Sequence, residues 1–283
     1  MQEIESASVL EMTDGSAASL LEEIQRRQAL PRLAPWVAGG ACLALVLATT
    51  AGLGGTVVLT ALAAGAGAFW WATVHDAMRR TVVIAYDLEP EAAARYEALI
   101  DSLKALGGAG GLWHVHAKAQ VRDQKYHAGA SSVIKRDSTR PRVGSPPIIR
   151  TNIDVPSLKV GRQELFFFPD RLLVFDGSHV GAVSYQGLQV ELGTIQFIED
   201  GSPPRDAQVI GTTWRYVNKN GGPDRRFKDN RELPILLYET IHFRSVTGLN
   251  ELLHVSRQGL GAAVLHACSG MAQITRQLAD AAS

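Results

Sequence analysis

The most unusual side chains of this 283-residue chain lie in one short segment, residues 215–231. This segment holds six basic residues against two acids, Asp224 and Asp229, with asparagine and glycine turn residues between them. The six bases are Arg215, Lys219, Arg225, Arg226, Lys228 and Arg231. Such a loop is expected to bind anions, whether lipid headgroups, nucleic acid or an acidic protein partner. A solvated loop with internal salt bridges accounts for the same composition, so both interpretations stay open.

A second group of candidate residues consists of histidines. His114 and His116 are two residues apart on a predicted strand, which directs both side chains to one face. Together with His127 they define a candidate three-histidine metal site. A hydrolytic site that uses Ser131 or Ser132 is the other enzymatic alternative, although no Gly-x-Ser-x-Gly motif is present. A strand with one solvated face explains the His-x-His pattern as well.

No further pattern of catalytic residues stands out, so we expect a binding or scaffolding protein without a cofactor rather than an enzyme. The net charge is zero and charged residues make up 20% of the chain. This composition gives no global attraction to nucleic acid, which is therefore not an expected partner. Two cysteines, Cys42 and Cys268, are too few for a disulfide framework, which favours a reducing compartment for the soluble part.

The element that must position these groups is a membrane anchor. From Leu33 to Val74 the chain has no Asp, Glu, Lys, Arg or His, a run of 42 residues, whereas one membrane span needs about 20. Gly52-Leu53-Gly54-Gly55 interrupts the run near its middle. We therefore predict a transmembrane hairpin over residues 34–75, with helices at 35–51 and 56–74. A buried hairpin of a soluble protein and a cleaved signal peptide are the alternatives, and the run is too long and too apolar for either.

The flanks of the anchor predict its orientation. Arg26, Arg27 and Arg32 precede the run, Arg79 and Arg80 follow it, and the connecting turn carries no charge. By the positive-inside rule both chain termini are predicted to be cytoplasmic, with the hairpin crossing the cell inner membrane twice. An aromatic belt on the same side is expected from three tryptophans, Trp36, Trp70 and Trp71. Small residues at four-residue spacing predict close helix approach; they are Gly40, Ala44, Ala61 and Gly65.

Residues 1–33 form a leader before the anchor. Around residues 16–27, acidic residues come early and basic residues late, and a thin apolar stripe runs through Leu20, Leu21 and Ile24. This pattern predicts a short helix on the membrane surface or against the soluble domain. Residues 1–12 are expected to be disordered. The sequence leaves the role of the leader open.

The region 76–160 is predicted to contain a strand, a helix and a strand. The first strand covers residues 81–88, the helix begins at Glu89-Pro90 and ends before the glycines at 107–111, and the second strand covers 112–121. Prolines between residues 137 and 161 favour an irregular loop there. The neighbouring stretch 118–150 carries eight bases and two acids, and we expect it to extend one basic face.

The region 161–283 is predicted to form an antiparallel β domain that ends in one helix, which makes the chain α+β. The predicted strands, joined by short turns, are 164–168, 171–176, 180–185, 188–192, 194–198, 214–218, 235–244 and 251–255. A helix follows from about Leu260 to Asp280 and is expected to bury Leu265, Cys268, Met271 and Leu278. This order of elements resembles the pleckstrin-homology-like fold, in which two sheets make a strongly bent barrel and a C-terminal helix closes one end.

Residues 81–256 also resemble an uncharacterised family of bacterial membrane proteins. The phrases that carry this resemblance are Val155-Pro-Ser-Leu-Lys-Val-Gly-Arg-Gln-Glu-Leu-Phe-Phe-Phe-Pro-Asp-Arg-Leu-Leu-Val, Gly181-Ala-Val-Ser-Tyr185, Trp214-Arg-Tyr-Val-Asn-Lys-Asn-Gly-Gly-Pro-Asp-Arg-Arg-Phe-Lys228 and Gly248-Leu-Asn-Glu-Leu252. The resemblance implies no activity and no catalytic residues, and it does not include the leader. Our expectation is a bacterial membrane-anchored cytoplasmic module for anionic ligands or lipid headgroups, with a homo-oligomeric scaffold as a further alternative.

Overall fold

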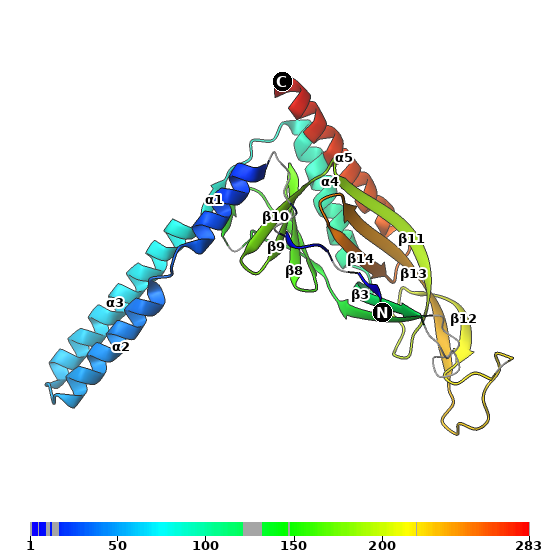
Figure 1. Ribbon diagram of the computed structural model, residues 1–283, viewed down its shortest axis with the longest axis horizontal. Helices are drawn as coiled ribbons and strands as arrows, with labels where there is room; N and C mark the ends of the chain where they lie inside the picture. The colour runs from blue at the N-terminus through cyan, green and yellow to red at the C-terminus, as the bar shows by residue number, and fades with distance from the viewer. Residues whose placement is uncertain are drawn as a thin grey trace. The chain divides into compact units, whose positions relative to one another are not determined.

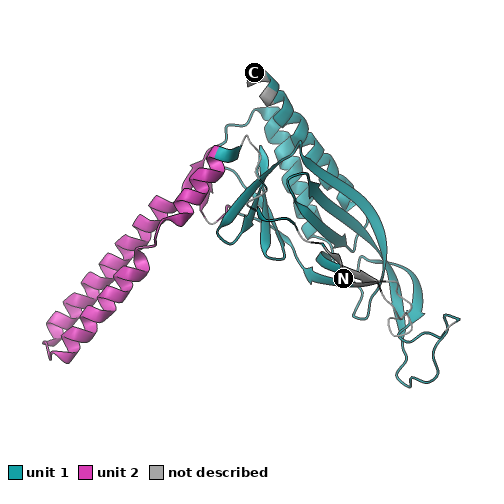
Figure 2. Cartoon of the chain, viewed as in Figure 1, with its two compact units in different colours: residues 1–18, 86–144, 153–283 teal, residues 19–85, 145–152 magenta. Residues whose placement is uncertain are grey.

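The computed structural model describes residues 2–4, 6–9, 12, 17–120, 132–146, 148–218 and 220–282. The chain is a mixture of helices and sheets and divides into two compact units (Figure 2). Unit 1 consists of residues 1–18, 86–144 and 153–283, and unit 2 consists of residues 19–85 and 145–152. Both units are discontinuous in sequence, so the chain passes from unit 1 into unit 2 and back twice.

Unit 2 contains the predicted helical hairpin. Helix α1 (Ala18–Ala29) precedes α2 (Ala34–Thr50) and α3 (Gly55–Arg80), and the last two pack against each other (Figure 1). The break falls at the predicted glycines, where Gly52 has a positive φ of 66° that other residues rarely adopt. At about 1.5 Å per residue, α2 is about 26 Å long and α3 about 39 Å, close to or above the ~30 Å hydrocarbon core of a bilayer.

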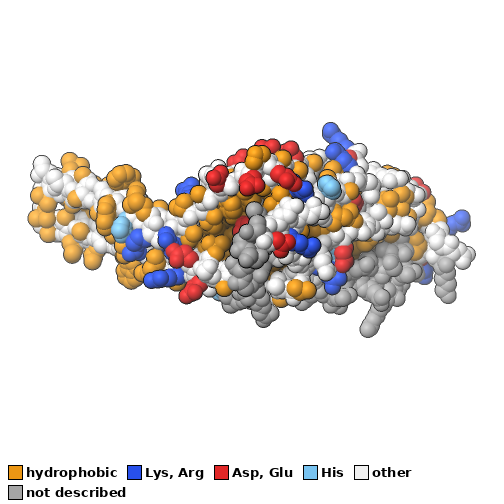
Figure 3. Space-filling model, turned by 90° about the horizontal axis from the view of Figure 1, so that it is seen from above, with side chains coloured by type: hydrophobic (Ala, Val, Ile, Leu, Met, Phe, Trp, Pro, Cys, Tyr) orange, Lys and Arg blue, Asp and Glu red, His pale blue; other side chains and the backbone are white. Residues whose placement is uncertain are grey.

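The apolar side chains of the hairpin lie on its outside, as Figure 3 shows for the face in view. Only 6% of the most apolar window of each helix is buried. Trp36 is 78% exposed and Trp70 is 70% exposed, near the ends of α2 and α3 that lie together at the base of the hairpin. Both helices are therefore long and apolar enough to cross a membrane, and their apolar surface is not used for packing inside unit 2.

Small residues bring the two helices together at one predicted position. A Cβ added to Gly65 would lie 3.0 Å from the Cβ of Ala41, so the glycine permits a close approach of the two helices there. A Cβ added to Gly40 would meet no atom within 4 Å, so Gly40 does not take part in the predicted contact.

Polar groups join the helices at the base of the hairpin. The buried carboxylate of Asp76 accepts hydrogen bonds from the backbone N–H groups of Leu33 (2.6 Å) and Ala34 (2.8 Å), where α2 begins. Two flanking arginines donate to backbone carbonyls across the same base, Arg79 to Pro31 and Arg80 to Gln28. A short parallel pair, β2 (Val82–Ile84) with β6 (Ile149–Thr151), completes unit 2.

A seven-stranded sheet forms one layer of unit 1, and all its pairings are antiparallel. The strand order is β1-β3-β14-β13-β11, with β4 also on β3 and β12 also on β13. The strands are β1 (Gln2–Glu3), β3 (Leu112–Gln120), β4 (Ser132–Ser138), β11 (Leu188–Ile198), β12 (Gln208–Trp214), β13 (Glu232–Ser245) and β14 (Asn250–Val255). Strand β11 is one continuous strand where two were predicted, and β12 ends where the strand at 214–218 was expected to begin.

A five-stranded antiparallel sheet forms the second layer, in the order β10-β9-β8-β7-β5. Its strands are β5 (Pro141–Val143), β7 (Pro156–Val160), β8 (Gln163–Phe167), β9 (Arg171–Asp176) and β10 (His179–Ser184). The three consecutive strands β8, β9 and β10 agree with the prediction. The predicted loop over residues 137–161 is wrong, because β5, β6 and β7 lie within it. Each of β5 and β7 begins with a proline, a position at which the missing N–H does not interrupt pairing.

Two helices lie side by side on unit 1, α4 (Pro90–Gly107) and α5 (Leu260–Ala282) (Figure 1). Met271 and Cys268 of α5 are buried, as predicted, and Leu265 is half-buried. The side chain of Leu278 lies outside the described residues. The hydrophobic core joins both helices to both sheets through residues that include Leu99, Leu103, Leu158, Phe167, Phe243, Leu253, Val264 and Met271.

The pleckstrin-homology-like arrangement is not confirmed. Among the described residues no closed barrel is found, and the strands form two separate main sheets. Each sheet contains strands from both sides of the predicted domain boundary at residue 160. In the five-stranded sheet β5 and β7 lie beside β8, and the seven-stranded sheet contains β3 and β4 together with β13 and β14. What remains of the prediction is an α+β fold of antiparallel sheets with a packed C-terminal helix.

The first part of the leader, residues 1–18, belongs to unit 1, whereas the rest of it belongs to unit 2. Strand β1 pairs with β3, the N–H of Ala7 donates to the carbonyl of Gly248 (2.8 Å), and the N–H of Ala182 donates to the carbonyl of Met12 (2.7 Å). Val9 and Met12 are 2% and 0% exposed and belong to the hydrophobic core. The expected disorder of residues 1–12 is therefore wrong for the part of the leader that the structure describes.

Candidate functional site

The basic segment 215–231 connects β12 to β13 and has an ordered internal structure. Asn230 accepts a hydrogen bond from the N–H of Tyr216 through Oδ1 (3.0 Å) and donates to its carbonyl through Nδ2 (2.8 Å). The ring of Tyr216 stacks on that of Phe227 with centroids 4.0 Å apart. An isolated antiparallel β-bridge pairs Val217 with Pro223 within the loop. These contacts hold the backbone of the loop while leaving most of its charged side chains at the surface.

The bases of this loop fall into two groups. Arg226 donates two hydrogen bonds to the buried carboxylate of Asp224, and Arg231 lies 2.7 Å from Asp200, so these two charges are locally balanced. Arg215, Arg225 and Lys228 are exposed, and no acid within 4 Å pairs with them in the described part of the chain. Lys219 lies outside the described residues. The internal salt bridges and the free cations that the sequence suggested are thus both present, on different residues.

The two histidines of β3 lie together, as predicted, with ring centroids 4.5 Å apart. Each is paired with a carboxylate through Nε2: His114 lies 2.5 Å from Glu251 and His116 lies 2.7 Å from Asp137. The first pair is buried and the second is close to the surface. His127 lies outside the described residues. The acids come from β14 and β4, so only the folded sheet brings these four side chains together.

The arrangement around His114 does not match a hydrolytic triad. Ser6 donates a hydrogen bond to Oε1 of Glu251 (2.5 Å) and accepts the N–H of Asn250 (2.9 Å), while His114 contacts the other carboxylate oxygen. The acid therefore stands between the hydroxyl and the imidazole, and the imidazole is not placed to take a proton from the serine. Among the described residues no group of three or more His, Cys, Asp or Glu side chains has the geometry to hold a metal ion.

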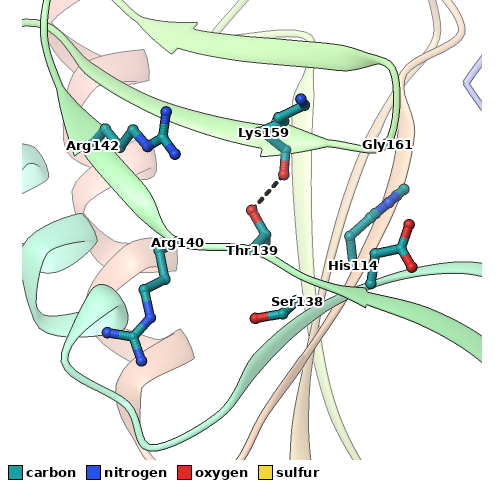
Figure 4. Close-up of a pocket in the computed structure, with 8 residues that line it drawn as sticks. His114, Ser138, Thr139, Arg140, Arg142, Lys159 and Gly161 are labelled. Carbon is teal, nitrogen blue, oxygen red and sulfur yellow. Dashed lines mark hydrogen bonds between the residues drawn. The ribbon is translucent and has the colours of Figure 1, made fainter.

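A cavity of about 420 Å³ opens beside His114 at one end of the two sheets of unit 1 (Figure 4). It is lined by His114, Asp137, Ser138, Thr139, Arg140, Arg142, Lys159 and Gly161. A neighbouring cavity of about 530 Å³ shares His114 and is lined also by Ser6, His116 and Glu251. The basic residues of the first cavity were missed as a site because residues 137–161 were interpreted as a loop. The basic stretch 118–150 was the signal that indicated Arg140 and Arg142, whereas Lys159 lies outside it.

Comparison of the chain with protein-family models, curated proteins and solved structures finds no match. The resemblance of residues 81–256 to a family of bacterial membrane proteins accordingly stays a hypothesis. What the two sites do must be inferred from their charges and geometry.

Proposed function

We propose that the protein is a membrane-anchored binding module that is tethered by the hairpin and contacts anionic lipid headgroups through the loop 215–231. The observation that supports the tethering is that chain segments on both sides of the hairpin belong to unit 1. Chain segments before and after the hairpin, represented by Met12 and Phe167, belong to one hydrophobic core. A chain that crosses a bilayer twice returns to the side from which it started, so this packing supports two crossings and both termini on one side.

The side on which unit 1 resides follows from charge. The arginines that flank the hairpin favour the cytoplasmic side of an inner membrane by the positive-inside rule. Arg79 and Arg80 also donate to backbone carbonyls at the hairpin base, and a guanidinium group has donors for both a carbonyl and a phosphate.

The loop is suited to a weak contact with an anionic surface. Arg215, Arg225 and Lys228 are exposed, and each base near such a surface contributes about 1 kcal/mol. A tethered domain meets the bilayer at a high effective concentration, because the anchor has already removed most of the entropic cost of association. Contacts too weak to recruit a soluble protein would therefore suffice to orient a tethered one.

The tethering is tested by the location of three sites in cells. Reporters that work only in the cytoplasm should be active at either terminus, and a cysteine replacing Gly54 should react with a membrane-impermeant reagent from outside. Reporter activity at one terminus alone would contradict the hairpin. Labelling of the Gly54 position only after lysis would contradict an outward-facing turn.

The lipid contact is tested with the full chain in nanodiscs, because residues 1–18 belong to unit 1 and a soluble fragment that begins after the hairpin would lack them. Hydrogen exchange in residues 215–231 should be slower in discs with anionic lipid than in neutral discs. The difference should fade with salt, since exposed charges are screened over about 8 Å at physiological ionic strength. The double variant Arg225→Glu, Lys228→Glu should abolish it.

The matched control for this experiment reverses two exposed charges elsewhere in unit 1, Arg205→Glu and Arg276→Glu. This control should keep the lipid-dependent protection of the loop. Equal exchange of the loop in neutral and anionic discs at low salt would refute the lipid contact while leaving the topology experiment unaffected.

A further inference from the structure

The cavity beside His114 carries an unbalanced positive charge that comes from two neighbouring strands. Arg142 pairs with Ser157 across β5 and β7, and Lys159 is two residues further along β7, so Arg142 and Lys159 share one face of the sheet. Arg140 is two residues before Arg142. The hydroxyl of Thr139 donates to the carbonyl of Lys159 (2.5 Å), which fixes this segment against β7 (Figure 4).

The acids nearby do not neutralise these three bases. Arg140, Arg142 and Lys159 are exposed, and none has an acid within 4 Å among the described residues. Asp137 lines the cavity but is engaged by His116 (2.7 Å). Glu164 stands opposite Lys159 on β8 and accepts a hydrogen bond from Ser157 (3.0 Å). Like charges side by side on one sheet face repel one another, so an anion between them would be stabilising.

The wall of the cavity offers a buried polar group that lacks a partner. His114 is 4% exposed, and within the described residues its Nδ1 has no hydrogen-bond partner. Leaving such a buried group unpaired is unfavourable, and a ligand that accepts or donates there would remove this cost. Its Nε2 lies 2.5 Å from Oε2 of Glu251, a close contact without hydrogen-bond geometry. The volume of about 420 Å³ lies in the range of small-molecule sites, about 300–1,000 Å³.

We propose that this cavity binds the phosphoryl group of a small phosphorylated ligand. Arg142 is the main group for phosphate oxygens, because a guanidinium can donate two parallel hydrogen bonds to them, and Lys159 adds a second positive charge on the same sheet face. Arg140 lines the same cavity, but its side chain is directed away from these two in Figure 4, so it adds charge at the edge of the site. Ser138 provides a hydroxyl at the wall. A single carboxylate would leave a surplus of positive charge, whereas a phosphate monoester or diphosphate carries a charge that matches three bases more closely. The proposal does not depend on the lipid contact of the loop 215–231.

The phosphoryl group can come from a soluble phosphate ester or from a phosphorylated lipid headgroup, and two arms of one experiment distinguish these sources. In the first arm, pyrophosphate is titrated calorimetrically into the full chain in neutral nanodiscs. In the second, hydrogen exchange of the strands β5 and β7 is compared between neutral discs and discs that contain a phosphoinositide. Saturable pyrophosphate binding identifies a soluble source, and protection in the second arm alone identifies a lipid source.

The variants Arg142→Gln and Lys159→Gln test the residues. Each should weaken the response by about tenfold or more in whichever arm is positive, because a charge-assisted hydrogen bond is worth about 1.5–3 kcal/mol. Their unfolding temperatures should stay unchanged, since both side chains are exposed. The control pair Arg225→Glu, Lys228→Glu should bind normally, which separates this site from the loop. No response in either arm, or a response that both glutamine variants retain, would overturn the proposal.

Discussion

The hairpin and unit 1 use the same apolar residue types in opposite ways. In the hairpin, Leu43 is 61% exposed and Leu59 is 67% exposed, and the side chains between the two helices are small. In unit 1, Leu99 and Leu103 of α4 are 0% and 1% exposed and meet side chains from α5 and both sheets. The difference is the one expected if the hairpin lies in hydrocarbon, as proposed, while unit 1 buries its apolar side chains in a core of its own.

The largest expected effect comes from placing a charge in each region. Met271 is fully buried, so Met271→Asp should unfold unit 1, with a loss of about 4 kcal/mol or more in the free energy of unfolding. The matched change Leu43→Asp should leave the core of unit 1 intact but disfavour membrane insertion by about 3 kcal/mol. Circular dichroism and membrane fractionation measure the two outcomes. A stable Met271→Asp protein would contradict the packing of α5.

The next effect tests whether the leader is a structural part of unit 1. A Cβ at Gly181 would lie 2.6 Å from the carbonyl oxygen of Val9. Gly181→Ala should therefore push the leader away and lower the free energy of unfolding by about 1–3 kcal/mol. Gly211→Ala is the control, because its Cβ would meet its nearest atom at 3.8 Å. Denaturant unfolding in detergent compares the two, and equal stability would mean that the leader contributes nothing.

A carboxylate in unit 1 gives a pH-dependent effect of similar size. Burial raises the pKa of Asp206, but hydrogen bonds from Ser256 (2.6 Å) and the N–H of Gly110 (2.8 Å), with the charge of Arg257, outweigh it and leave the pKa below its ordinary value. A lowered pKa contributes stability above the unfolded pKa of about 3.9 and loses it as pH falls further. Asp206→Ala should cost about 1–3 kcal/mol at pH 7.

The pH dependence of unfolding serves as the control for the Asp206→Ala variant, because the effect of the charge on stability should depend on pH. The stability difference between the wild type and Asp206→Ala should shrink as pH falls below about 4, because the carboxylate is protonated first in the unfolded state and only at lower pH in the folded state. Denaturant titrations at several pH values report this difference. A gap that is independent of pH would show that the side chain stabilises unit 1 through packing and not through its charge.

The smallest effect concerns the carboxylate at the base of the hairpin. Asp76 accepts the N–H groups of Leu33 and Ala34, so it acts as a cap for α2 that comes from the neighbouring helix. Asp76→Ala should destabilise the start of α2 by about 1 kcal/mol, in the range of ordinary N-cap losses. Faster hydrogen exchange at residues 33–37 in nanodiscs measures it, and exchange at 55–60, at the far end of the hairpin, should not change.

The hairpin could be predicted because its signal is local. A run without charge and a glycine break are read from consecutive residues. The bounds of α2 and the start of α3 fall within one residue of the prediction, whereas α3 continues past the predicted end at Val74 to Arg80. Strands β8 to β10 were equally easy to predict, since each pairs with its sequence neighbour through a tight turn. Strands β5 and β7 were missed because Pro141 and Pro156 suggested a loop, although a proline at the first residue of a strand leaves the pairing intact.

The candidate sites were harder to predict because they depend on partners far away in sequence. His114 meets Glu251, and Arg231 meets Asp200, and neither pairing follows from spacing. The histidine pair itself was correct as a local pattern on one strand. Sheet register and turn geometry decide which bases of the loop 215–231 are paired with acids. They also decide that Arg142 and Lys159 share one face of the sheet.

The placement of the leader also constrains the order of events during biosynthesis. Ala7 and Met12 are synthesised before the hairpin, but their backbone partners, Gly248 and Ala182, are synthesised after it. The leader must therefore wait until both partner segments exist, and long-range pairing of this kind is slow to form. In the proposed topology, a chain whose hairpin inserted with its ends on opposite sides could not bring Met12 into the core of unit 1. Completion of unit 1 would then act as a check on membrane insertion.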